Sequence, residues 1–386
     1  MKKQVIITTS FPKDKNDYSG LFTYSYLKLN KLDSVVIAPH ASKLKEFEQW
    51  DNVKIIRVKY APEKFEKLFY NLGVPDNLKN SPLLSIFAIP WLIKSSLIAY
   101  NQLNKDDILI THWAFPTGIS GAFLKFIKKD IIHINIIHSA GITILKNKKL
   151  KFFTKFLYKY SDKLHFVNTE HIKWFEALIN KKLNKEKLIL KPMPITTCMS
   201  KTMVNNVVTN TMEQKKANPI IGDNNILYLG RIVKIKGLDL MLDELKSIKK
   251  TNIIIAGNGN LKSELENKYV YAKFVGSVFG KEKENLLIKS NIMIIPSISN
   301  NGQIEGFPTT ILEGAVNKNL LIISKEVKGI DYIFKDRINC LYYNPYKKGE
   351  LKKIIQTLNQ KKMEAMIELG YNSALNVLES YNFDFI

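Results

Sequence analysis

The stretch IMIIPSISNNGQIEGFPTTILEGAVNKNLLIIS, residues 292–324, contains one complete unit of a pattern that the rest of the chain repeats. It opens with four apolar residues, passes through a polar loop and ends in a second apolar run. Short apolar runs bounded by turn residues are typical of buried parallel strands, and proline suits the first turn of a helix. The stretch therefore predicts a strand, a loop, a helix that begins at Pro308 and carries Glu313, and a second parallel strand.

The same alternation of short apolar runs and longer segments of helical period extends in both directions. It predicts one series of strands at residues 4–8, 34–37, 53–58, 108–111, 134–137 and 163–167, and a second at 226–229, 253–256, 272–275, 292–295, 320–324 and 340–343. Strands that alternate with helices form parallel sheets covered on both faces. We therefore expect an α/β protein of two doubly wound, Rossmann-like domains that face a central cleft.

A change of composition divides the two series. Residues 191–225 contain three prolines and many Asn and Thr, with little periodicity. With 386 residues and about 100 to 200 residues per domain, two domains are expected. We predict a first domain at 1–195, a linker at 196–224, a second domain at 225–365 and a helical segment at 366–386.

The charge is strongly basic, +23 in total, and residues 1–200 hold 32 basic and 16 acidic side chains. One interpretation is a protein that binds nucleic acid or another polyanion, although no known DNA- or RNA-binding motif accompanies the charge. Another is an anionic membrane surface, contacted through the lysines and aromatics of residues 145–160. The same segment also fits an ordinary surface helix that packs one apolar face on a core, formed by Phe152, Phe153, Phe156, Leu157 and Tyr160.

Further features limit the cellular setting. Cys198 and Cys340 are far apart and form no metal or disulfide pattern, which favours a reducing compartment. We expect no membrane span, because Pro90 and Lys94 interrupt the most apolar stretch, residues 81–100. The expected location is the cytoplasm, with peripheral association with the inner face of the cytoplasmic membrane as a further hypothesis.

Two carboxylates stand out in the opening stretch. Glu305 lies in the loop, and at about 1.5 Å per residue Glu313 sits roughly 7 to 8 Å along the helix from Pro308. Carboxylates at that spacing suit an elongated ligand with many hydroxyl groups, while the backbone N–H groups of Gly306 and Phe307 favour an anion. For an isolated pair of this kind, the more common explanation is a solvated helix carboxylate at Glu313 and a partner of the helix dipole at Glu305.

Two other strand-end loops carry candidate residues. In GRIVKIKG, Arg231 and Lys236 precede a helix that begins near Gly237, so two cations could converge on one diphosphate. In IIIAGNGN, Gly257 and Gly259 permit either a tight turn or close approach of the backbone to a ligand.

The second half of the chain resembles the retaining nucleotide-sugar glycosyltransferases of family 4, which have the GT-B fold. The matching segments, in the family's order, are GRIVKIKG, IIIAGNGNLKSEL, FVGSV, NIMIIPS and EGFPTTILEGA, which fits the E-x7-E signature of the family. The resemblance implies that Arg231 and Lys236 bind the donor pyrophosphate and that Glu313 accepts hydrogen bonds from the donor ribose. It also implies that Glu305 faces the donor sugar, with Gly306, Phe307 and Pro308 beside it, and that Val278 lies near the nucleobase.

The first half is similar to the family in two segments, THWAFPTGISGA and INIIHSAG. His138 matches the position that faces the donor sugar, and His112 is a weaker candidate on the acceptor side. Gly20 is the other acceptor-side candidate, although Ser19 stands where many relatives have a second glycine. As in similar enzymes, residues 366–386 are expected to return to the first domain.

The resemblance implies a retaining glycosyltransferase of the hexosyltransferase type. Together with the basic first half, it suggests a role in the synthesis of a surface polysaccharide such as lipopolysaccharide, or of a glycolipid. The expected partners are a nucleotide-sugar donor and a lipid-linked or oligosaccharide acceptor. The chain has no D-x-D pair, so we expect a metal-independent reaction without a cofactor. The alternatives are a polyanion-binding protein and a nucleotide-sugar epimerase or hydrolase of the same fold.

Overall fold

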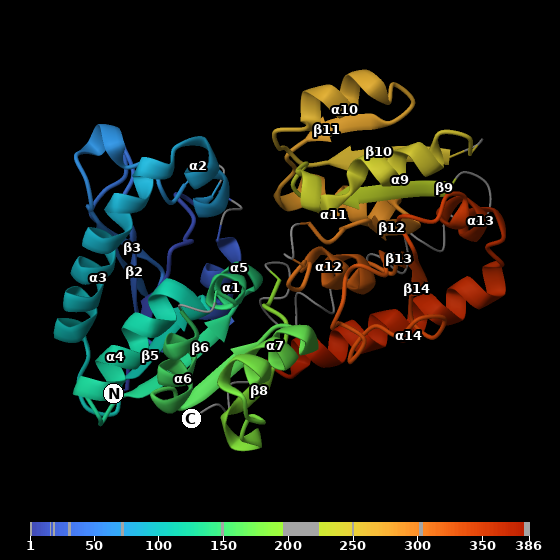
Figure 1. Cartoon of the computed structure of the whole chain (residues 1–386). Helices are drawn as coiled ribbons and strands as arrows, with labels where there is room; N and C mark the ends of the chain where they lie inside the picture. Colours follow the sequence, from blue (N-terminus) through green and yellow to red (C-terminus); the bar gives the residue numbers. More distant parts are fainter. Residues whose placement is uncertain are drawn as a thin grey trace. The chain divides into compact units, whose positions relative to one another are not determined.

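The computed structural model describes residues 2–15, 17, 20–29, 32–70, 73–147, 150–195, 224–248, 251–300 and 304–381. The chain divides into two compact units, unit 1 (Met1–Pro192) and unit 2 (Met193–Ile386), each described here by itself (Figure 1). The expected linker lies almost wholly outside the described residues, as do Ser19, Lys148, Lys149 and Cys198. The predicted domain limits therefore remain predictions.

Unit 1 is built on a sheet of eight strands in the order β3-β4-β2-β1-β5-β6-β7-β8. All six strands expected in this half are present: β1 (Gln4–Ile7), β2 (Ser34–Pro39), β4 (Val53–Val58), β5 (Ile108–His112), β6 (Ile132–Ile137) and β7 (Lys163–Phe166). The sequence pattern missed the two edge strands, β3 (Phe47–Trp50) and β8 (Leu188–Leu190). The expectation of a purely parallel sheet was wrong at one edge, because β3 pairs with β4 in the antiparallel sense.

Helices connect these strands. They are α1 (Leu21–Leu29), α2 (Val74–Asn80), α3 (Ala88–Gln102), α4 (Ile119–Ile127), α5 (Ser139–Leu145), α6 (Lys151–Lys159) and α7 (Thr169–Ile179). The expectation that α6 packs on a core is confirmed for Leu157, which is buried. It was wrong for Phe152, which is 70% exposed because its position points away from the side of Leu157.

Pro90 does not interrupt the apolar stretch of residues 81–100 as we expected. It stands in the first turn of α3, where no backbone N–H is needed for the helical hydrogen bonds. Together with the short turn η2 (Pro82–Phe87), α3 gives one helical segment, Pro82–Gln102, long and apolar enough by length and composition to cross a membrane. Trp91 and Ala99 of this segment are nonetheless fully buried in unit 1.

Unit 2 contains a parallel sheet in the order β11-β10-β9-β12-β13-β14. All six predicted strands are present: β9 (Asn224–Leu229), β10 (Thr251–Ala256), β11 (Lys273–Gly276), β12 (Ile292–Ile295), β13 (Leu320–Ser324) and β14 (Leu341–Tyr343). The helices are α9 (Leu238–Leu245), α10 (Lys262–Lys268), α11 (Gly280–Lys289), α12 (Thr310–Val316), α13 (Glu350–Gln356) and α14 (Gln360–Glu379). The predicted fold class, two mostly parallel α/β sheets, is confirmed.

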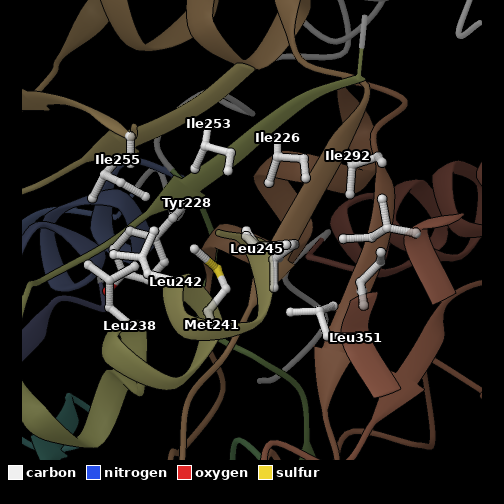
Figure 2. Packing of buried hydrophobic residues seen from close by; sticks show 14 of the residues in the cluster. Ile226, Tyr228, Leu238, Met241, Leu242, Leu245, Ile253, Ile255, Ile292 and Leu351 are labelled. Atoms are coloured by element: carbon white, nitrogen blue, oxygen red, sulfur yellow. The ribbon is translucent and has the colours of Figure 1, made fainter. Parts of the chain in front are cut away.

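The core of unit 2 joins α9 to the sheet. Figure 2 shows Leu238, Met241 and Leu242 of α9 beside Tyr228 of β9 and Ile255 of β10. Positions 238, 241, 242 and 245 recur at three and four residues, so one face of α9 is apolar and buried. This packing holds the loop between β9 and α9 at the carboxyl end of the sheet.

The C-terminal helix α14 packs on α12 and β13 within unit 2. Lys318 pairs with Glu368 at 2.7 Å, and the Asn339 side chain donates to the Ser373 hydroxyl at 2.9 Å. The predicted boundary between residues 365 and 366 falls inside this single helix. The return of the last residues to the first domain stays a prediction.

The order of the strands marks one special position in each sheet. In unit 2 the chain builds outward from β9 toward β11 on one side and from β12 toward β14 on the other. In unit 1 the corresponding pair is β1 and β5. Loops at the carboxyl ends of such neighbouring strands diverge and leave room for a ligand. The loops after β9 and β12 carry most of the predicted site residues.

Candidate active site

A partly buried group of opposite charges forms in the loops that follow β9 and β12. The ammonium of Lys236, from the loop after β9, lies 2.7 Å from the Glu305 carboxylate, from the loop after β12. The Ser297 hydroxyl donates to the same carboxylate at 3.2 Å. We call Arg231, Lys236, Ser297 and Glu305 the Glu305 group. The structure thus brings together three of the predicted residues, and Ser297, which the sequence did not single out, completes the set.

The charges keep Glu305 ionised. Burial alone raises the pKa of its carboxyl, but the charge and hydrogen bond of Lys236, with a smaller effect of Arg231, outweigh burial, so the pKa lies below its ordinary value. The Arg231 side chain is exposed, and within the described residues it forms no ion pair with a carboxylate. It remains available for an anion.

Glycines hold the loops of the site against one another. At Gly237, with φ of 61°, an added Cβ would lie 2.2 Å from the Pro296 carbonyl oxygen. At Gly257, with φ of 148°, it would lie 1.8 Å from the Gly230 oxygen. A Cβ at Gly259 would meet the Ile232 oxygen at 2.1 Å, so both Gly257 and Gly259 allow close contact with a neighbouring loop of this chain. The close approach of their backbone to a ligand stays a prediction.

Glu313 lies in a second ion pair. It is only 6% exposed and stands on α12, where its carboxylate lies 2.8 Å from the ammonium of Lys283 on α11. Lys283 is a residue that the sequence analysis missed, because nothing in the spacing of residues 283 and 313 signals the contact. α12 begins at Thr310 rather than at Pro308. Thr309 is in the N-cap position without a side-chain capping hydrogen bond, and the Pro308 carbonyl accepts a hydrogen bond from the Ile311 N–H at 2.9 Å.

The remaining predicted residues of unit 2 line the same loops. Gly306, which directly follows Glu305, is partly exposed, and the next two residues, Phe307 and Pro308, are buried. Val278 is buried, 5% exposed, in the loop that leads from β11 into α11. It follows Ser277, whose hydroxyl accepts a 3.0 Å hydrogen bond from the Asn258 side chain.

In unit 1, two predicted histidines lie in contact. His112 ends β5 and His138 follows β6, and Nδ1 of His112 lies 3.1 Å from Nε2 of His138. Phe22 of α1 packs against the His138 ring at 5.2 Å, and Trp113 does so at 4.6 Å. We call His112, Trp113, His138 and Phe22 the histidine group. Phe22 had no signal in the sequence analysis.

Burial controls the charge of both rings. It lowers the pKa of His112 to about 3, and burial, reinforced by the neighbouring histidines, holds the pKa of His138 well below its usual range. Both are therefore neutral near pH 7. Within the described residues, Nε2 of His112 and Nε1 of Trp113 are buried without a hydrogen-bond partner. Buried polar atoms of this kind are uncommon, and a ligand hydroxyl or water would satisfy them.

Gly20, the other acceptor-side candidate, precedes α1. Its φ is 78°, and an added Cβ would lie 2.5 Å from the backbone carbon of Ser10, in the loop after β1. Its N-terminal neighbours in the loop are outside the described residues. Gly20 therefore has a structural reason to be glycine, whichever ligand the loop contacts.

Comparison with known proteins gives these features a family context. Residues 210–373 match the model of the family described as glycosyl transferases group 1. The chain is 28% identical over 298 residues to an uncharacterized glycosyltransferase of Methanocaldococcus jannaschii, covering 74% of this chain and 76% of that protein. It is 21% identical over 313 residues to the O-antigen chain mannosyltransferase C of Escherichia coli, covering 79% of each.

Solved structures share the fold across nearly the whole chain. Anabaena HepE in complex with UDP superposes with a TM-score of 0.66 at 13% identity and covers 99% of this chain and 98% of its own. The UDP-forming trehalose-phosphate synthase of Burkholderia vietnamiensis gives 0.72 at 10% identity and covers 100% and 98%. The chain thus has the fold of GT-B glycosyltransferases. The family match and the relatives support a glycosyltransferase.

Proposed function

We propose that this protein is a retaining glycosyltransferase that moves a hexose from a nucleotide diphosphate sugar to an acceptor. The observation that carries the proposal is the Glu305 group, in which a lysine and an arginine stand beside an ionised carboxylate at the β9–β12 position. The relatives support the donor class, because Anabaena HepE is known in complex with UDP and with UDP-glucose.

The chemistry needs negative charge on the leaving diphosphate to be stabilised while positive charge grows at the anomeric carbon. An ammonium has three donors, and Lys236 uses one of them on Glu305. Its other donors, with the exposed Arg231, would bind the diphosphate. This is a clamp of protein cations, in keeping with a metal-independent reaction.

The negative charge of Glu305 suits the anomeric carbon of the donor sugar, where positive charge develops in the reaction. As an ionised carboxylate it would accept hydrogen bonds from the donor sugar and stabilise the cationic character of the anomeric carbon. Gly306, Phe307 and Pro308 would contact the same sugar, and Val278 would lie near the nucleobase. Glu313, held in place by Lys283, would accept hydrogen bonds from the donor ribose.

In the retaining reaction, the acceptor hydroxyl attacks the face from which the diphosphate leaves, and the diphosphate takes the hydroxyl proton. The neutral His138 ring would donate or accept a hydrogen bond with the donor sugar, and His112 and Gly20 would serve the acceptor side. We place the reaction in the synthesis of a surface polysaccharide or glycolipid, with a lipid-linked or oligosaccharide acceptor. The O-antigen relative supports this setting. The proposed location is cytoplasmic, with peripheral association with an anionic membrane surface.

A thermal-shift panel tests the donor. The purified chain is heated with UDP-, GDP-, ADP- and CMP-sugars and with the free nucleotides. The true donor nucleotide at hundredfold excess over its dissociation constant should add about 2.7 kcal/mol of stability. One responding nucleotide identifies the base, and a panel without any response contradicts donor binding by the free enzyme.

Product analysis then tests the reaction. Incubation of the responding sugar nucleotide with and without acceptors separates transfer from the alternatives. A transferase consumes the donor slowly until an acceptor is added, and its product keeps the anomeric configuration of the donor. Full consumption without any acceptor would indicate a hydrolase or an epimerase instead.

A further inference from the structure

A continuous row of apolar side chains stands exposed on unit 1. It runs along η2 and α3 at spacings of three and four residues, so its members share one side of the helix. Between 40% and 84% of each side chain is accessible to solvent. We call this row the α3 apolar face, and it consists of Leu83, Ile86, Ile89, Ile93, Leu97 and Tyr100.

The opposite side of the same helix is anchored in the core. Trp91 and Ala99 are fully buried, and the Trp91 ring lies 4.9 Å from that of Phe69. α3 packs on β1, β2 and β4, and it lies along the outer edge of unit 1 (Figure 1). A helix fixed in this way lies flat against its own unit. Although its composition would suit a membrane span, it can present only one side to a partner.

Neighbouring elements enlarge the apolar surface. The exposed Phe65 ring stacks on Phe87 of η2 at 6.0 Å. Helix α4, which packs beside α3, carries three further aromatic or aliphatic side chains, each about half exposed: Phe123, Phe126 and Ile127. Soluble monomers rarely expose contiguous apolar surface of this extent unless it binds something.

Lysines flank the face, and the helical segment that forms it carries no carboxylate. Residues 81–103 contain no Asp or Glu. Lys94 donates to the Lys59 carbonyl at 3.0 Å, and Lys128 lies over the Tyr100 ring at 4.2 Å. Lys64 lies over the Phe65 ring at 5.0 Å, and its neighbour in the sequence, Glu63, accepts a hydrogen bond from the Lys43 N–H at 3.2 Å. Within the described residues, none of these three lysines forms an ion pair with a carboxylate, so their charges are not neutralised locally.

We propose that the α3 apolar face binds the surface of a bilayer that contains anionic lipid, with α3 in the plane of the interface. Aliphatic side chains would enter the acyl boundary while the flanking lysines contact lipid phosphates. A second copy of the chain fits less well as the partner. Residues 1–200 of each copy hold 32 basic and 16 acidic side chains, so two copies that met through this half would repel each other. A polar partner protein would find no hydrogen-bonding groups among the aliphatic side chains.

The inference deepens the membrane part of the proposed function and does not depend on the sugar-transfer chemistry. It also moves the membrane contact from residues 145–160, where the sequence analysis placed it, to residues 83–100. A membrane held there would give unit 1 access to lipid-linked acceptors.

Vesicle cosedimentation tests the proposal. The full chain is mixed with phosphatidylcholine vesicles, with and without phosphatidylglycerol, at low and high salt. The variant Ile89→Gln/Ile93→Gln/Leu97→Gln changes only exposed positions, so it should fold normally. Its partitioning onto anionic vesicles should fall at least about tenfold, since three aliphatic side chains lose their apolar contact. High salt should weaken binding of the wild type.

A matched control changes three aliphatic residues of similar exposure on unit 2, in the variant Val270→Gln/Ile338→Gln/Leu369→Gln. It should bind vesicles like the wild type. A second comparison, Lys151→Gln/Lys155→Gln/Lys159→Gln, removes the exposed charges of α6. The melting temperature and the nucleotide response of each variant verify folding and the donor site separately.

Several results would overturn the proposal. Unchanged partitioning of the α3 variant would do so, as would an equal loss in the unit 2 control or a loss confined to the α6 variant. The wild type could instead fail to bind vesicles and sediment as a dimer, while the α3 variant sediments as a monomer. In that case the face joins two copies of the chain. A transferase that responds to its donor but never binds vesicles would refute this inference alone.

Discussion

Removal of the Lys236 ammonium should expose how strongly the Glu305 group depends on its charge balance. The Lys236→Met variant keeps most of the side-chain volume but leaves the Glu305 carboxylate without its nearest cation. The largest effect that opposes burial, which raises the pKa of Glu305, would then be gone, while the effects of Arg231 and Ser297 would remain. We expect the variant to be inactive and unit 2 to be less stable at neutral pH.

The magnitude follows from the burial of the pair. Breaking a fully buried ion pair from one side costs about 3 to 5 kcal/mol. The Lys236 and Glu305 side chains keep 16% and 18% of their exposure, so the lower end, about 3 kcal/mol, applies. For a unit of this size, each kcal/mol lowers the melting temperature by roughly 2 to 4 °C, which gives a decrease of roughly 6 to 12 °C.

The sign of the pH dependence separates this effect from simple loss of packing. In the wild type the Glu305 pKa is depressed, so the pair stabilises the protein above about pH 4.3 and this contribution is lost as the pH falls through the depressed value. In the variant the pKa should be raised, so its penalty is present at neutral pH and disappears on acidification. The difference in stability between the two proteins should therefore shrink as the pH falls toward 4.

Scanning calorimetry of the full chain measures these values, with the transition of unit 2 assigned by its response to nucleotide. The double variant Lys236→Met/Glu305→Gln should recover most of the lost stability, because the uncompensated carboxylate is gone. Lys234→Met is the matched control, since Lys234 lies in the same turn and pairs with Asp239 at 2.6 Å but is 60% exposed. It should change the melting temperature little. Equal effects of the two lysine variants, or no recovery in the double variant, would refute the reasoning.

Three further predictions concern other parts of the molecule. Glu313→Gln and Lys283→Met should each lower kcat/KM for the donor at least about tenfold in steady-state kinetics. The control Glu282→Gln changes an exposed residue of α11, the helix that carries Lys283, and should leave kcat/KM unchanged. Normal values for the first two variants would refute the assignment of Glu313 to the donor ribose. Gly257→Ala should lower the free energy of unfolding of unit 2 by about 3 kcal/mol, because the added methyl group is overpacked and the backbone is strained. The control Gly276→Ala is strained at φ of 76°, but its added methyl group would have no neighbour within 4 Å. Urea unfolding should show a measurably smaller loss of stability for this control. Burial lowers the pKa of His133, His165 and His171 to about 4, so the unfolded chain binds more protons between about pH 6.5 and 4, and stability should fall as the pH falls through that range. Within the described part of the chain, neither ring nitrogen of His171 has a hydrogen-bond partner, so His171→Leu should make this fall smaller in calorimetry at pH 7 and 5.

The sequence allowed most of the fold to be predicted because the buried strands are short apolar runs with sharp ends. β4, β12 and β13 were predicted with their observed limits. The edge strands β3 and β8 were missed for a physical reason. An edge strand buries little of its surface, so it needs no long run of apolar residues. Phe47–Trp50 contains two polar residues, and Leu188–Leu190 is apolar but only three residues long.

The candidate site divides in the same way. The residue types and their order were evident in the sequence, since Arg231, Lys236 and Glu305 stand in loops that follow predicted strands. The ion pair between Lys236 and Glu305 was not evident, because these two residues are 69 positions apart and meet only where β9 and β12 lie side by side. Lys283 was missed altogether, since its contact with Glu313 depends on the packing of α11 near α12.

What the sequence determined by itself was the alternation of strands and helices, the position of the strand-end loops and the chemical groups in those loops. Local periodicity and turn residues specify these features without distant contacts. The tertiary structure alone decided which groups meet, which glycines allow two loops to lie in close contact and which side of α3 faces solvent. Such features depend on contacts between segments far apart in the chain, and only the packed sheet brings those segments together.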